Sequence, residues 1–112
     1  MSSSKEYFYY ISEQLSLVDG ISFRPMMGEY VVYLRDKVAG GIFDDRLMIK
    51  PVASALDFVE NPVLELPYEK GSKMLLVEET DDREFLRELF ERIYDELPMP
   101  KSKKKRQEKK MK

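Results

Sequence analysis

Four short apolar runs separated by polar breaks dominate the middle of the chain. Within the second run, Tyr30, Val32 and Leu34 alternate with their neighbours and would share one face of a strand. Three-residue polar breaks follow at 35–37 and 44–46. Such runs predict an antiparallel meander with tight connections. The four runs occupy residues 22–27, 29–34, 38–43 and 47–49.

Three other segments, residues 2–18, 52–60 and 82–97, have apolar residues at helical spacing. The first predicts an N-cap at Ser3 or Ser4, and the third begins with an Asp81–Glu84 capping pattern. Glu88 and Arg92, four residues apart, are expected to pair on the third helix. The apolar stripe of the first segment consists of Phe8, Ile11, Leu15 and Val18.

The order of these elements predicts the fold class. Residues 73–78 read as a last strand, and residues 63–71 as a connection. We therefore expect a two-layer α+β fold, in which an antiparallel sheet of four to five strands has its helices packed on one face. At 112 residues the chain has room for one domain, expected at 1–98, followed by a tail at 99–112.

A glycine pair, Gly40-Gly41, interrupts one of the strand runs. Glycine inside a strand indicates a β-bulge or the close packing of a helix on the sheet. The alternative, a phosphate-binding loop, requires a Lys and a Ser or Thr after the glycines, and these are missing.

The same region carries a recognisable motif. It reads FRPMMGEY at 23–30, then Tyr33-Leu34, then DDRLMIK at 44–50, and it resembles the N-terminal domain of the TfoX/Sxy family of bacterial competence regulators. Met27 stands where that pattern has an aromatic residue, and Glu29 and Asp45 stand where it has glycines. The resemblance extends more loosely to Pro67-Tyr68 and the helix near residue 90.

The resemblance implies a fold similar to secretion-chaperone-like domains and a non-enzymatic regulatory role. TfoX/Sxy proteins act as co-activators alongside the cyclic-AMP receptor protein, so a protein partner in transcription or competence control is expected. Longer family members have a C-terminal helical domain, where this sequence has a basic tail. The alternative is a stand-alone interaction or chaperone-like domain that forms a homodimer and does not bind DNA.

Charge is distributed unevenly along the chain. The last twelve residues contain eight basic residues and one acidic residue, which leaves 11 basic and 20 acidic residues in 1–100. An acidic body of about −9 therefore precedes a tail of about +7, although the formal total is only −2. The basic residues of the tail are Lys101, Lys103, Lys104, Lys105, Arg106, Lys109, Lys110 and Lys112.

Three interpretations of the tail remain. It is a solvated extension, a non-specific nucleic-acid contact that neutralises phosphates, or a contact for an anionic membrane surface. The tail lacks aromatic residues for base stacking and an apolar face for membrane anchoring. We expect it to be disordered when free, and we expect no membrane partner.

Little in the sequence points to catalysis. Histidine and cysteine are both absent, so imidazole and thiolate chemistry and the metal sites built from them are excluded. Two carboxylate pairs, Asp44-Asp45 and Asp81-Asp82, sit where a turn and a helix start favour Asp for structural reasons. We therefore expect no enzymatic activity, no cofactor and no metal.

The remaining candidate contacts lie in the family-like stretch. Arg24, Arg46 and Lys50 are either ordinary solvent-facing charges or a surface for a partner. The methionines at 26, 27, 48 and 74 are either core residues or an adaptable contact surface. The lack of cysteine and of a signal-peptide pattern at the N-terminus is compatible with a cytoplasmic location.

Overall fold

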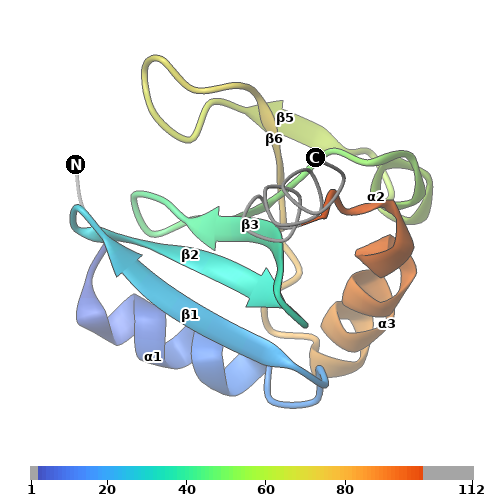
Figure 1. The fold of residues 1–112 in the computed structure, drawn as a ribbon, viewed down its shortest axis with the longest axis horizontal. Coiled ribbons are helices and arrows are strands. Elements are labelled where there is room, and N and C mark those ends of the chain that lie inside the picture. The colour runs from blue at the N-terminus through green and yellow to red at the C-terminus, as the bar shows by residue number, and fades with distance from the viewer. Residues whose placement is uncertain (1–2, 100–112) are drawn as a thin grey trace, which may run out of the picture.

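The computed structural model describes residues 3–99, which form a mixed helix and strand structure (Figure 1). None of the helices in this range is both long enough and apolar enough to cross a membrane. The elements, in chain order, are α1 Lys5–Gln14, β1 Ile21–Met26, β2 Glu29–Leu34, β3 Lys37–Ile42, β4 Leu47–Ile49, α2 Ala53–Phe58, β5 Val63–Glu65, β6 Met74–Leu76, α3 Arg83–Ile93 and the 3-10 turn η1 Tyr94–Glu96.

The sheet is antiparallel and open, with the strand order β1-β2-β3-β4-β6-β5. The expectation of four to five strands is therefore wrong, because the sheet has six. The additional strand is β5, which lies within the segment predicted as a connection. At three residues β5 is too short to show alternation, and only its pairing with β6 reveals it, with Leu64 opposite Leu75.

The meander is connected by three two-residue hairpins. Each turn has two central residues with positive φ, namely Met27-Gly28, Arg35-Asp36 and Asp44-Asp45. This is the pattern of type I′ turns, whose twist matches that of the flanking strands. The polar breaks are thus one residue shorter than the sequence suggested, because Lys37 and Arg46 belong to the strands' hydrogen-bonded ends.

The helices and the core lie on one side of the sheet (Figure 1). As predicted, Val32 and Leu34 are fully buried, and Tyr30 packs against the same core. The odd-numbered residues of β4, Leu47 and Ile49, join them. The predicted apolar stripe of the first helix is also confirmed, since all four of its residues lie in this core or pack against it.

The helix boundaries follow from their caps. The Ser4 hydroxyl accepts a hydrogen bond from the Tyr7 backbone N–H at 3.1 Å, so Ser4 is the N-cap of α1. The cap of α3 is Asp82, whose carboxylate accepts from the Phe85 N–H at 3.0 Å, one residue later than the Asp81 pattern predicted. The expected Glu88–Arg92 pair is present at 3.0 Å.

The glycine pair in β3 lies directly beside a β-bulge, one of the two features that the sequence indicated here. Val32 pairs with Gly40 but Tyr33 pairs with Val38, so Ala39 is the extra residue. The second reason for glycine is close approach. A Cβ at Gly40 would lie 2.0 Å from the Met48 carbonyl oxygen, and one at Gly41 would lie 2.6 Å from both the Phe43 ring and the Tyr30 carbonyl oxygen.

Gly40→Ala is expected to lower the free energy of unfolding by about 3 kcal/mol or more, because the new methyl group would meet backbone atoms that cannot move without distorting the sheet. Urea denaturation of the variant and the wild type measures this difference. Gly71→Ala is the matched control, since its Cβ would meet only the Tyr68 and Pro67 side chains at 3.0 Å or more. Equal losses in the two variants would contradict the explanation.

Met27→Asn is expected to raise the free energy of unfolding by up to about 1 kcal/mol. Met27 holds φ at 52° and is 95% exposed, so the change creates a favoured Asn-Gly turn and removes almost no packing. Met26→Asn, one residue earlier in β1, should destabilise the protein because asparagine fits a strand poorly. Thermal unfolding of both variants tests the sign of each effect.

Candidate functional site: the open face of the sheet

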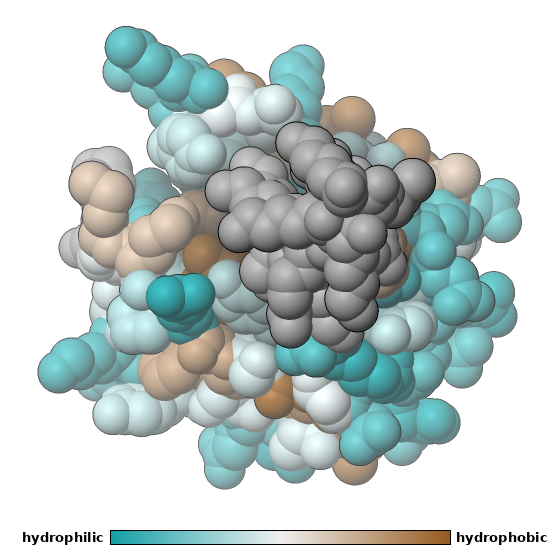
Figure 2. Space-filling view, in the orientation of Figure 1, coloured by the Kyte–Doolittle hydropathy of each residue, from teal (hydrophilic) through white to brown (hydrophobic). Residues whose placement is uncertain are grey.

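The side of the sheet opposite the core, here called the open face, has no helix packed against it in the part of the chain that the structure describes (Figure 1). Directly paired residues share a face, so the strand registers define one row across it. This row runs through Arg24, Val31, Gly41, Met48, Leu76 and Val63. Figure 2 shows this side, where apolar and hydrophilic side chains are interspersed.

The open face is more apolar than a purely solvent-exposed sheet surface. Val31 and Leu76 in this row are half-buried, and so are Tyr33 and Val38, which pair with each other one step along the strands. Met48, at the centre of the row, is fully buried. An apolar strip of this kind suits contact with another protein surface better than contact with water alone.

All three cations predicted for a partner surface lie on this face. Arg24 pairs with Val31 in the row, and Arg46 and Lys50 have the same parity along β4 as Met48. Arg24 is exposed and Lys50 is half-buried. The structure therefore brings together residues that are up to 26 positions apart in sequence.

Arg46 differs from the other two because its donors are engaged within the fold. Its Nη1 bonds to Glu65 Oε1 at 2.8 Å, its Nη2 to the Pro67 carbonyl at 3.3 Å and its Nε to the Phe43 carbonyl at 3.1 Å. The side chain thus joins the β3–β4 hairpin to β5 and the loop after it. This geometry gives Arg46 a structural role and leaves Arg24 and Lys50 as the more available cations.

An aromatic pair next to Arg46 could not be anticipated from the sequence. The Phe43 ring lies over Gly41 and is only 8% exposed, and Tyr68 from the β5–β6 loop contacts it with ring centroids 5.9 Å apart. Tyr68 itself is exposed. Because β5 was not predicted, no sequence signal placed Tyr68 beside the sheet.

The first carboxylate pair is part of a polar cluster that anchors the start of the chain. Asp45 Oδ1 accepts from the Ser4 N–H at 2.8 Å, and the Asp45 N–H donates to Ser3 Oγ at 3.0 Å. Glu29 accepts from both the Ser3 hydroxyl, at 2.6 Å, and the Asp44 N–H. Burial, together with Tyr10 and Asp45 nearby, raises the pKa of Tyr7 above its ordinary value. The hydrogen bonds with Ser3, Ser4 and Asp44 give Glu29 and Asp45 structural roles at two positions where the chain departs from the family-like motif.

The carboxylate pairs do not converge on a common point. Asp45 and Asp82 are occupied with the anchoring and capping bonds already described. Within residues 3–99 there is no group of three or more Asp or Glu side chains arranged to hold a metal ion. The carboxylates of Asp45 and Asp82 therefore have structural partners.

The four methionines separate into two kinds. Met48 is fully buried, and Met74 is half-buried on the open face. Met26 is 49% exposed at the end of β1, and Met27 projects into solvent from the first turn. Met48 is therefore buried as a core-type residue, and an adaptable contact surface stays a prediction for the exposed Met26 and Met27. The eight predicted nucleic-acid contacts, Lys101 to Lys112, lie outside the described residues.

Comparison with known proteins finds a bacterial relative of low identity and no matching family. An uncharacterized 12.7 kDa protein in the trpE 5′ region of Spirochaeta aurantia is 26% identical over 105 residues, which cover 93% of this chain and 91% of that protein. No family model matches the sequence. No solved structure matches it either. The chain is therefore similar over nearly its full length to a bacterial protein of the same size.

Proposed function

We propose that this chain is a non-enzymatic regulatory or adaptor module of the TfoX/Sxy type that binds a protein partner in transcription or competence control. The open face of the sheet is the proposed contact surface. A cytoplasmic location and a secretion-chaperone-like arrangement of the sheet and helices are part of the same proposal. The observation that carries it is the partly apolar sheet face, which has no helix against it in residues 3–99 and which carries Arg24 and Lys50.

The charge of the open face suggests the chemistry of its partner. Arg24 and Lys50 stand on this face, whereas residues 1–100 as a whole carry 20 acidic and 11 basic residues. Two cations therefore stand on a face that also carries Glu29 and Glu65, in a body that is acidic overall. A partner that presents carboxylates around an apolar contact would complement this face, because opposite charges steer association and select the partner.

The motif at 23–50 supports the choice of family. The motif spans β1 to β4, which form the larger part of the open face. It includes Arg24 within β1 and Arg46 and Lys50 on either side of β4. Two departures from the pattern, Glu29 and Asp45, take part in the bonds that hold the N-terminal segment. The matched bacterial protein is uncharacterized and adds no functional information.

The double variant Arg24→Glu and Lys50→Glu tests the surface. Quantitative affinity capture from a bacterial host lysate is expected to recover a transcription-related protein with the wild type and at least tenfold less of it with the double variant. The matched control is Lys5→Glu with Lys70→Glu, which reverses two exposed cations on α1 and in the β5–β6 loop. This control should capture as much partner as the wild type.

Equal capture by all three proteins would contradict the proposal for the open face. Sedimentation of the purified wild type distinguishes the alternative. A stable dimer that the double variant separates into monomers, without any captured partner, would favour a stand-alone dimerising domain.

The tail at 101–112 is proposed to tether the module non-specifically to nucleic acid. Anisotropy of a labelled duplex DNA is expected to show binding by the full chain but not by a chain that ends at Pro98. The logarithm of the affinity should fall by about 0.9 per phosphate contact for each tenfold increase in salt. Identical binding by the two chains would show that the tail is not the contact.

A further inference from the structure

β1 forms one end of the sheet, and its outer edge has no strand beside it in the range that the structure describes. At six residues it is twice as long as β5, the strand at the opposite end. An unpaired strand of this length presents a row of backbone donors and acceptors that can pair with another extended chain.

The hairpin register shows which residues have their backbone groups directed outward. Met26 and Glu29 close a two-residue turn and form a hydrogen-bonded pair, so Arg24, Ser22 and Gly20 also bond inward to β2. The Arg35 N–H bond to the Gly20 carbonyl at 2.9 Å agrees with this parity. Ile21, Phe23 and Pro25 therefore direct their backbone groups to the free edge, and of these Ile21 and Phe23 also supply an N–H.

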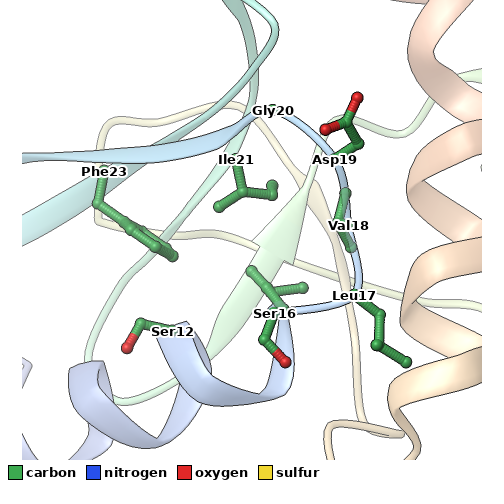
Figure 3. A pocket seen from close by; sticks show the side chains of 9 residues that line it. Ser12, Ser16, Leu17, Val18, Asp19, Gly20, Ile21 and Phe23 are labelled. Atoms are coloured by element: carbon green, nitrogen blue, oxygen red, sulfur yellow. The ribbon is translucent and has the colours of Figure 1, made fainter.

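A pocket adjoins the same edge. Its volume is about 390 Å³, and it lies between β1 and the C-terminal end of α1 (Figure 3). The side chains of Ile21 and Phe23 descend from β1 into it, while Ser12 and Ser16 come from the α1 side. In an antiparallel pair, directly opposite residues share a face. A residue that bonds to the backbone of Phe23 or Ile21 would therefore point its own side chain toward this pocket.

The charges next to the pocket are acidic. α1 has no basic residue in its last turn, so nothing there offsets the partial negative charge of its C-terminal end. Asp19 is among the lining residues, and it is exposed, with its carboxylate directed away from Ile21 and Phe23 (Figure 3). Arg35 has its aliphatic part close to Gly20, but its guanidinium pairs with Glu91 at 2.6 Å and stacks over Tyr94. The pocket wall itself contains no Lys or Arg.

We propose that the edge of β1 and this pocket form a docking site for an extended segment of a partner protein, which adds to the sheet as a seventh strand and places a lysine or arginine side chain in the pocket. The aliphatic stem would pack on Ile21 and Phe23, and the cation would reach the rim at Asp19. This site is separate from the open face, so it adds a second contact surface to the proposed adaptor.

A second copy of β1 fits this site less well. In a pair of β1 strands, the side chains that would face the pockets are Ile21 and Phe23, and each already packs against its own core. Phe23 also holds an edge-to-face contact with Phe8, with centroids 5.2 Å apart. A foreign strand has a free side chain for the pocket, and the acidic body of residues 1–100 favours one that is basic.

The probe is a fluorescein-labelled peptide with the sequence Thr-Val-Lys-Val-Thr, titrated with the full chain at low salt. Saturable binding is expected, and a peptide with Glu in place of Lys should bind at least tenfold more weakly. Methylation of the lysine backbone nitrogen should abolish binding, because that N–H is directed at the β1 edge.

Three variants of the protein locate the site. Ser12→Trp fills the pocket and should weaken binding at least tenfold, whereas Glu13→Trp, on the same helix but outside the pocket lining, should not. Asp19→Lys lies in an exposed loop, so it keeps the fold and should reverse the preference toward the Glu peptide.

No saturable binding at about 1 mM peptide would overturn the proposal, as would binding that tolerates the N-methyl group or the Ser12→Trp change. A dimer that Ser12→Trp dissociates would assign the edge to a second copy instead. The pair Arg24→Glu and Lys50→Glu acts on the other side of the sheet. If this double variant loses partner capture but binds the peptide as well as the wild type does, the open face and the β1 edge are separate contact surfaces.

Discussion

The close approach of β3 to β4 at Gly40 is the constraint on which the sheet depends. The Met48 carbonyl oxygen occupies the space that a side chain at Gly40 would need, so the two strands pack at this distance only because residue 40 is glycine. The adjacent bulge at Ala39 shifts the pairing of β2 and β3 by one residue. Together they let Ile42 and Ala39 both face the core in spite of the irregular register.

This central region separates two surfaces with different properties. On one side, residues of all three helices close a continuous apolar core, which supplies the stability of the domain. On the other side, half-buried residues such as Val31 and Tyr33 lie among cations. The two ends of the sheet also expose apolar side chains. Met26 lies in β1 and Leu17 precedes it, whereas Val63 lies in β5 and Leu66 follows it. A small domain with one covered face therefore offers several places for contact with other proteins.

Polar interactions hold the segments that the core does not reach. Gln14 is a buried polar residue of α1, and its Nε2 donates to the Thr80 carbonyl at 2.9 Å while its Oε1 accepts from Arg83 at 3.1 Å. Arg46 links the β3–β4 hairpin to β5 in a similar way. Each of these contacts joins residues 19 or more positions apart, so they depend on the assembled fold.

The sequence by itself determined the features that depend on local spacing. Alternation placed Tyr30, Val32 and Leu34 on one face, helical periodicity identified the buried stripes, and Gly40-Gly41 indicated a bulge, because each pattern reflects the backbone period of a single element. Only the tertiary structure decided that Val63–Glu65 is a strand, that Asp45 anchors the N-terminal segment, and that Arg24, Arg46 and Lys50 share a face. These features depend on contacts between distant segments, and no local pattern records which segments meet.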